Sequence, residues 1–344
     1  MRLQPLSLFY SRWLRQMPTE AKLTQSVDRP PAKRSILANW RRYIIYIGFV
    51  CIFVVFAFTL GNQGFLDPNN LLNIVRQSAM IAVMAVAMTF VLATGEIDLS
   101  VGSLAGFSSV VTAMTIRAAG MPAGIAAGLA TGVAVGLFNG LVTTGIGIPS
   151  FLATLAMMGI ATGMSMWMSD TAAIPILNDT YSFIFGGGNL GPVPVLLLWT
   201  LAFGVVGHLV LKKTSFGRRI LATGGNEMAA RFSGIDTKSI KLRVLMISSV
   251  TAAIAGMLYA GRLESGRYQF GQGDELSVIA AAVLGGNSLF GGVGTVVGAI
   301  VGALMIGLIN NGLILMGLEY SQQLIVRGGI IILAVALSQQ TRRS

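Results

Sequence analysis

Residues 94–103 read Thr-Gly-Glu-Ile-Asp-Leu-Ser-Val-Gly-Ser and combine the residue types best suited to polar chemistry in this chain. The segment lies between long apolar stretches, where an ionised side chain is costly unless it is solvated or paired. Two interpretations are open. The glycines and free amides would allow a helix to break here, so that Glu96, Asp98, Ser100 and Ser103 line or gate a path. Alternatively, the segment is an ordinary polar turn at a membrane surface.

Three asparagines are further candidates for contact with a polar solute. Asn139 lies in Gly-Leu-Phe-Asn-Gly, a pattern that returns 171 positions later as Gly-Leu-Ile-Asn-Asn around Asn310. Asn287 lies in the glycine-rich loop 284–294. These amides can exchange hydrogen bonds with a hydroxyl-rich solute, or they can tie neighbouring helices together.

The loop 212–243 is strongly basic, with eight Lys and Arg residues. Within it, Asn226 can cap a short helix that begins at Glu227, where an acidic side chain suits the positive end of the helix dipole, and Gly234 can end it. Such a helix of about two turns is marginal alone but suits the cleft of a partner protein. A simple surface linker is the alternative, although a linker needs no caps.

The elements that must position these residues are membrane helices. Of the 344 residues, 54% are apolar and only 11% are charged, and 43 are glycine. This composition predicts an all-α integral membrane protein. We expect about ten membrane elements, at 43–60, 71–93, 99–117, 122–145, 149–168, 192–211, 243–261, 275–290, 293–316 and 322–338.

Cations sort by side of the membrane. Nineteen of the 24 Lys and Arg residues lie in 1–42, in 212–243 and at the C-terminus. The positive-inside rule then puts both termini and loop 212–243 in the cytoplasm and loop 169–191 outside. We expect two domains, a flexible basic tail over 1–42 and a transmembrane domain over 43–340 that includes the cytoplasmic loop 212–243.

The repeated patterns predict an internal duplication. Asp98-Leu-Ser-Val returns as Glu275-Leu-Ser-Val, so each copy covers about five membrane elements. Because five is odd, the second copy enters the membrane from the opposite side, which is typical of transporters whose path lies at the repeat interface. Glycines spaced by four, in the runs 124–136 and 294–302, predict close helix packing.

The sequence excludes or disfavours several classes of protein and of binding site. No G-x-x-x-x-G-K-[ST] pattern occurs, so the chain has no nucleotide-binding P-loop of its own. The single cysteine, Cys51, excludes a disulfide framework, and the single histidine, His208, lies in an apolar run. The net charge of +11 follows from membrane topology, so we expect no nucleic-acid partner.

Three motifs in this order resemble the permease subunits of monosaccharide ABC importers, for ribose, galactose, arabinose and xylose. They are Gly-Glu-Ile-Asp-Leu-Ser-Val-Gly-Ser, Thr-Gly-Gly-Asn-Glu-x-Ala-Ala-Arg-x-Ser-Gly-Ile and Val-Leu-Gly-Gly-Asn-Ser-Leu-Phe-Gly-Gly-Val-Gly-Thr. The resemblance covers about residues 43–340. It implies that the second motif forms the helix that couples the permease to its ATPase, with Gly225, Asn226, Glu227, Ala230, Arg231, Gly234 and Ile235 as the coupling residues.

The resemblance also implies the partners. These are a second permease copy, a cytoplasmic ATPase that holds ATP and Mg²⁺, and an extracytoplasmic sugar-binding protein, assembled at a bacterial cytoplasmic membrane. The chain itself would bind no cofactor and catalyse no covalent reaction. Permeases for autoinducers, nucleosides and branched-chain amino acids are related, so these solutes stay open. A secondary transporter with Glu96 and Asp98 as ion sites stays open as well, and so does a channel with re-entrant loops.

Overall fold

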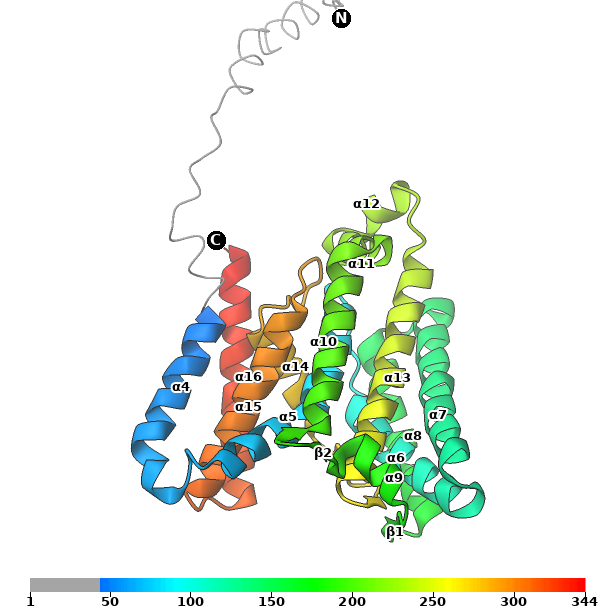
Figure 1. Cartoon of the computed structure of the whole chain (residues 1–344). Helices are drawn as coiled ribbons and strands as arrows, with labels where there is room; N and C mark the ends of the chain where they lie inside the picture. The colour runs from blue at the N-terminus through cyan, green and yellow to red at the C-terminus, as the bar shows by residue number, and fades with distance from the viewer. Residues whose placement is uncertain (1–43, 344) are drawn as a thin grey trace, which may run out of the picture. The chain divides into compact units, whose positions relative to one another are not determined.

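The computed structural model describes residues 44–343 and is almost entirely helical (Figure 1). The tail predicted over 1–42 lies outside the described residues. Eight of the described helices are long and apolar enough to cross a membrane. They are α4 (Ile44–Leu60), α5 (Pro68–Ala93), α6 (Val101–Ala119), α7 (Met121–Leu141), α8 (Ser150–Ser169), α10 (Val195–Lys213), α13 (Thr237–Arg262) and α15 (Val296–Leu315).

These eight helices correspond to eight of the ten predicted elements, which confirms a multi-pass all-α membrane protein. The remaining two elements differ in kind. Helix α14 (Asp274–Leu284) has 11 residues, so it extends about 16 Å and covers only about half of a hydrocarbon core. It ends six residues before the predicted boundary. Helix α16 (Tyr320–Arg343) has 24 residues and is not among the eight. The ten-helix, two-repeat arrangement therefore stays a prediction.

The remaining elements are short and lie in the connections. They are the single turns η2 (Gly61–Gln63), η3 (Val142–Ile146), α9 (Asp179–Ser182) and η4 (Phe183–Gly187), the helices α11 (Ser215–Gly225) and α12 (Glu227–Phe232), and four two-residue strands. Strand β1 (Ile174–Pro175) pairs antiparallel with β4 (Ser265–Gly266), with Ile174 opposite Gly266. Strand β2 (Asn189–Leu190) pairs likewise with β3 (Val193–Pro194). The first pair ties the loop after α8 to the segment after α13.

Helices α5 and α13 form the centre of the helical body and are buried for most of their length. Met80, Met84 and Met88 of α5 are fully enclosed, which fits a helix with neighbours on all sides. Helix α4 is the opposite case, because it is apolar all round and mostly exposed, as expected for a helix facing lipid.

The glycine rows are packing surfaces, as predicted. A side chain at Gly132 would meet Ala253 and the backbone of Val250 in α13, and one at Gly136 would meet Met246. In the second row, a side chain at Gly298 or Gly302 would collide with backbone carbonyls of Gly285 and Ala281. Small residues let these helices approach closely, as is usual in membranes.

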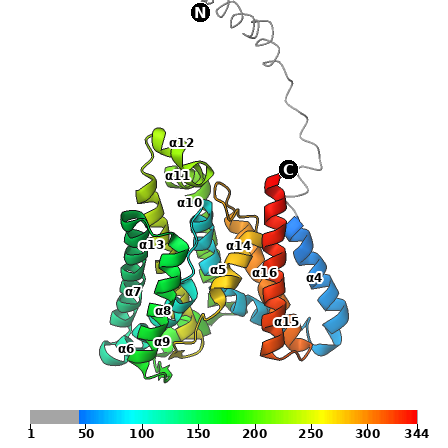
Figure 2. The ribbon, with the colours of Figure 1, turned by 180° about the vertical axis from the view of Figure 1, so that it is seen from behind.

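Figures 1 and 2 show α4 and α16 side by side at one edge of the helical body, with α7 and α8 at the other. The start of α4, the end of α16 and the helix α12 all lie at the same end of the helices. Strand β1 and helix α9 lie at the opposite end. The end that carries α12 therefore also carries the two ends of the described chain.

Candidate functional site

Residues 94–100 form a non-helical interruption between α5 and α6. Gly95 takes a φ of 82°, which a residue with a side chain rarely adopts, and so lets the chain leave the end of α5. Side chains of α8 then accept the hydrogen bonds of backbone amides that would otherwise be made within a helix. Ser150 accepts from the amide of Ile97 at 3.1 Å, and Thr154 accepts from the amide of Leu99 at 3.0 Å. Backbone groups away from water need such partners, so the break is built into the packing of α8.

Asp98 is at the buried end of this interruption and is 0% exposed. Its Oδ1 accepts from the amide of Ser100 at 2.9 Å and from the hydroxyl of Ser100 at 2.6 Å. Asn139 of α7 donates through Nδ2 to the Ser100 hydroxyl at 3.1 Å, and the Ser103 hydroxyl donates to the Ser100 carbonyl at 3.0 Å. The structure therefore brings four predicted residues into one cluster.

The cluster lies deep among the helices and is not an exposed surface turn. Asp98 lies beside Ser248, eleven residues into α13, which is about 16 Å along the helix. The described residues provide no cation within ion-pair distance of Asp98. Two oxygens, Asp98 Oδ2 and Asn139 Oδ1, have no hydrogen-bond partner among the described residues. A buried carboxylate held only by neutral groups is an uncommon arrangement and marks this position as a functional candidate.

A second interruption, between α13 and α14, contacts α6, the helix that follows the first interruption. Residues 265–273, which are strand β4 followed by turns, run beside α6, where the Ser109 hydroxyl donates to the carbonyl of Arg267 at 3.1 Å. At the start of α6, Gly102 lies against the carbonyl of Gly271 and the carboxylate of Glu275, so closely that a Cβ there would collide with both. Asp98 and Glu275 open the two repeated patterns. The repeats therefore place one acidic residue in or beside each break.

Sequence reasoning missed Glu275 as a site residue. Its signal was present, because the match between Asp98-Leu-Ser-Val and Glu275-Leu-Ser-Val singled it out as the repeat partner of a site candidate. What the sequence lacked was the close contact between α14 and Gly102, which joins residues far apart in the chain.

Asn287 and Asn310 do not join the Asp98 cluster. Asn287 is buried in the loop after α14, where it donates to the carbonyl of Ala282 at 2.6 Å and accepts from the amide of Thr295 at 2.6 Å. It thus holds the two ends of that loop together. In α15 it is Asn311, and not Asn310, whose side-chain amide bonds to another helix. Asn311 and Asn70 each donate to the other's side-chain oxygen, at 2.8 and 3.1 Å.

Helix α12 has the boundaries that its sequence predicts. Asn226 accepts from the amide of Ala229 at 3.0 Å, which caps the first turn. At the other end Gly234 takes a φ of 81°, and the amide of Ile235 donates back to the carbonyl of Ala230 at 3.0 Å. Ala230 is buried, whereas Met228 is 69% exposed and Phe232 is 86% exposed. The helix therefore presents apolar side chains at the tip of a basic loop.

An ion network ties α12 to the helical body. Glu227 accepts from Arg231 at 2.5 Å, from Thr237 at 3.1 Å and from Lys241 at 2.9 Å. Lys241 also contacts Glu96, with 2.6 Å between Nζ and Oε1. Burial alone would raise the pKa of Glu227, but hydrogen bonds from Lys241 and Arg231 outweigh it and hold the pKa below its usual value. Sequence reasoning placed Glu96 at the break but missed Lys241 as its partner.

Two glycine motifs contact one another beneath this loop. A side chain at Gly224 would collide with the carbonyl of Ala93, at the end of α5. Gly291 and Gly292 have φ values of 87° and 78°, and both lie against the backbone of Gly224 and Gly225. The Gly-Gly-Asn-Glu motif therefore rests directly on the Phe-Gly-Gly-Val motif of the second repeat.

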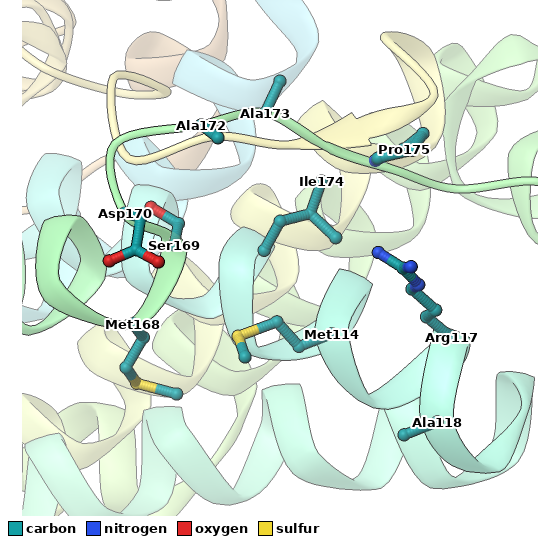
Figure 3. A pocket seen from close by; sticks show the side chains of 10 residues that line it. All are labelled: Met114, Arg117, Ala118, Met168, Ser169, Asp170, Ala172, Ala173, Ile174 and Pro175. Carbon is teal, nitrogen blue, oxygen red and sulfur yellow. The ribbon is translucent and has the colours of Figure 1, made fainter.

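Two surface cavities lie elsewhere. One, of about 500 Å³, opens near β1, and Arg117 and Asp170 lie on opposite sides of Ile174 in it (Figure 3). The second, of about 590 Å³, lies between α6, α7 and α8 and has Thr131 as the one polar residue of its lining. Neither cavity contains a residue of the predicted path.

The chain matches a family model over residues 70–335, and that family is described as the permease component of branched-chain amino acid transport systems. The chain belongs to this permease family. The match covers every residue of the two breaks and of α12. A permease component transports rather than catalyses, so this permease is not an enzyme, as the sequence predicted.

Curated relatives agree with the resemblance found in the motifs. The permease is 40% identical to the ribose import permease protein RbsC of Bacillus subtilis, over 85% of this chain and 90% of the relative. It is 38% identical to the L-arabinose ABC transporter permease protein AraH of Azospirillum brasilense, over 86% of this chain and 88% of the relative. The ribose import permease of Escherichia coli is 37% identical over 81% and 88%. No solved structure matches this permease significantly.

Proposed function

We propose that this permease is the membrane-spanning subunit of an ATP-binding-cassette importer that carries a monosaccharide, a pentose or a hexose, into the cell. The observation that carries the proposal is helix α12. It is short, capped at both ends and exposes Met228 and Phe232, on a chain without a nucleotide-binding motif. A marginal helix with an apolar tip is stabilised when it rests in the cleft of another protein. The names of the ribose and L-arabinose permeases support the solute class.

The membrane would be the bacterial cytoplasmic membrane, with both termini and loop 212–243 in the cytoplasm. Two observations support this orientation. Nineteen of 24 cations lie in those three regions. The start of α4 and the end of α16 also lie at the same end of the helices as α12.

The partners would be a cytoplasmic ATPase that holds ATP and Mg²⁺, a second copy of this permease, and an extracytoplasmic sugar-binding protein. The ATPase would contact α12 through residues 225–235. The binding protein would deliver the sugar at the end that carries β1 and α9. Closure of the ATPase on ATP would displace α12, and the path would then open alternately to the two sides.

Within the permease, the two breaks would act as the gates. Glu96, Asp98, Ser100, Ser103 and Asn139 form or adjoin the first break, and the contacts of this cluster are to neutral groups except at Glu96. Neutral hydroxyl and amide groups suit a hydrated sugar, because weak and multiple contacts let the solute leave again. Asn287 would adjoin the gate indirectly, by holding the loop after α14 in shape, and Asn310 would lie near the end of α15.

The test is reconstitution of the full assembly. The permease, with the ATPase and binding protein encoded beside it, is placed in proteoliposomes, and uptake of labelled ribose, arabinose, xylose and galactose is measured. We expect one of these sugars to enter only with ATP and with binding protein, and to stimulate ATP hydrolysis. Uptake driven by a proton gradient without ATP, or stimulation only by an amino acid or a nucleoside, would reject the proposal.

A further inference from the structure

Lys241 holds two carboxylates that come from different parts of the fold. Its ammonium lies 2.6 Å from Glu96 in the interruption and 2.9 Å from Glu227 in α12. The side chains of Lys241 and Glu96 are only 17% and 12% exposed. The contact is therefore partly shielded from water, where an ion pair is screened less than at a surface.

Each carboxylate leads to a different functional region. Glu227 is the first residue of α12, whose exposed tip would meet the ATPase. Glu96 lies two residues before Asp98 in the short segment between α5 and α6 that belongs to no helix, and its own amide donates to the carbonyl of Val91 at the end of α5 at 3.2 Å. A shift at Glu96 is therefore passed along the backbone to the buried Asp98 and its hydrogen bonds to Ser100.

The balance of charges makes the connection between Glu227 and Glu96 depend on the ammonium group of Lys241. One cation lies between two anions, and Glu227 alone has a second cation, Arg231. Without the ammonium, Glu96 would have no ion pair among the described residues, and a partly buried charge left unpaired is strongly unfavourable. A lysine also suits a moving contact, because its flexible stem lets a compact ammonium follow a carboxylate.

We propose that Lys241 is the positioning residue through which movement of α12 reaches residues 94–100 and the buried Asp98. This inference rests on the proposed function, because Lys241 would link the surface that contacts the ATPase to the gate of the permease. When α12 moves, the Glu227–Lys241–Glu96 bridge moves the interruption with it, so that ATP hydrolysis and opening of the gate occur together.

The experiment compares Lys241→Met with Lys238→Met in the complete reconstituted assembly. Methionine keeps much of the length of the lysine stem and removes the charge. Lys238 is the matched control, since it lies one turn earlier on the same helix, is exposed, and has no ion pair among the described residues. We expect Lys241→Met to hydrolyse ATP but to lower sugar uptake per ATP about tenfold, within the usual range for coupling between sites. Lys238→Met should match the wild type.

A second variant tests whether a loss of uptake comes from a lost ion pair or from a dissociated ATPase. Glu96→Gln leaves the Lys241–Glu227 pair intact and should keep the ATPase bound while lowering uptake per ATP in the same way. Lys241→Arg, which keeps the charge, should restore part of the ratio. An unchanged ratio in Glu96→Gln and Lys241→Met would overturn the inference.

A third measurement separates this inference from the proposed function. Amide hydrogen exchange of residues 94–100 should be faster in Lys241→Met than in Lys238→Met, whatever solute the assembly carries. If exchange is unchanged, the bridge does not hold the interruption and the inference is wrong. If exchange is faster but the wild-type assembly imports no sugar, the bridge stands and the proposed function fails.

Discussion

At the residue scale, Gly102 sets how closely the start of α6 approaches the second interruption and the start of α14. Its missing side chain leaves room for the carbonyl of Gly271 and the carboxylate of Glu275. Both neighbours belong to a different part of the chain, and the carbonyl cannot rotate away as a side chain would. The position therefore tolerates glycine only.

We predict that Gly102→Ala lowers the stability of the permease, by about 1–3 kcal/mol as is typical of overpacking. Thermal unfolding in detergent would show a lower midpoint. Gly159→Ala in α8 is the matched control, because a Cβ there meets nothing within 4 Å. A helix interior favours alanine over glycine, so the control should be neutral or slightly stabilising. Equal midpoints for Gly102→Ala and wild type would contradict the close contact.

A second residue-scale prediction concerns Asp98. The change Asp98→Asn keeps an oxygen that can accept from the Ser100 amide and hydroxyl, but it replaces the buried carboxyl group by an amide. We expect transport to fall several-fold while the order of preference among sugars stays the same, because a gate controls rate rather than recognition. Uptake competition among the four sugars measures both quantities.

The control for that change is Asp179→Asn, at an exposed position in the first turn of helix α9. It removes one carboxylate that lies outside the Asp98 cluster, and at a saturating concentration of binding protein, which offsets any weaker docking at this end, it should leave transport unaltered. Full transport by Asp98→Asn in an intact assembly would make Asp98 a structural residue and place the gate elsewhere.

At the scale of elements, α12 depends on its caps. It has six residues and is held by one N-cap hydrogen bond, the glycine at its end and the network around Glu227. Such a helix does not persist through its own propensity, so each cap is a large share of what keeps it formed.

We predict that Asn226→Ala destabilises α12 by about 1 kcal/mol, because the amide of Ala229 loses its acceptor. The ATPase should then co-purify less completely with the permease, with membrane insertion unaffected. Asn226→Asp is the matched control, since aspartate offers the same acceptor at the cap and should retain the ATPase. Equal recovery of ATPase with both variants would show that the cap has no part in docking.

At the scale of the whole molecule, the arrangement of helices gives a test of sidedness. The end that carries β1 and α9 should face outward and the end that carries α12 inward. Leu177, beside the N-cap of α9, is 94% exposed and is a suitable position for an introduced cysteine. The next residue, Asn178, is less suitable, because its side chain accepts from the amide of Tyr181.

We predict that an impermeant thiol reagent added outside labels Leu177→Cys and fails to label Lys238→Cys. The native Cys51 is exposed on α4 and is first replaced by serine, so that labelling reports the introduced position alone. Labelling after permeabilisation checks that Lys238→Cys is reactive. The reverse pattern of accessibility would invert the proposed topology.

The sequence by itself determined the features that depend on short stretches of chain. Apolar length predicted ten membrane elements, of which eight correspond to helices long and apolar enough to span, and Asn226 and Gly234 predicted both ends of α12, because a span or a cap needs only neighbouring residues. Four-residue glycine spacing likewise predicted the packing faces, since helical periodicity alone puts those residues on one side.

Only the tertiary structure decided which distant residues meet. It joined Lys241 to Glu96, put Glu275 against Gly102, buried Asp98 beside Ser248, and paired Asn311 rather than Asn310 with Asn70. Neighbouring residues on a helix differ by about 100° in direction, so the rotation of α15 about its axis decides which of the two asparagines faces Asn70. A single chain fixes such rotations by packing all its helices at once, and no local pattern encodes them.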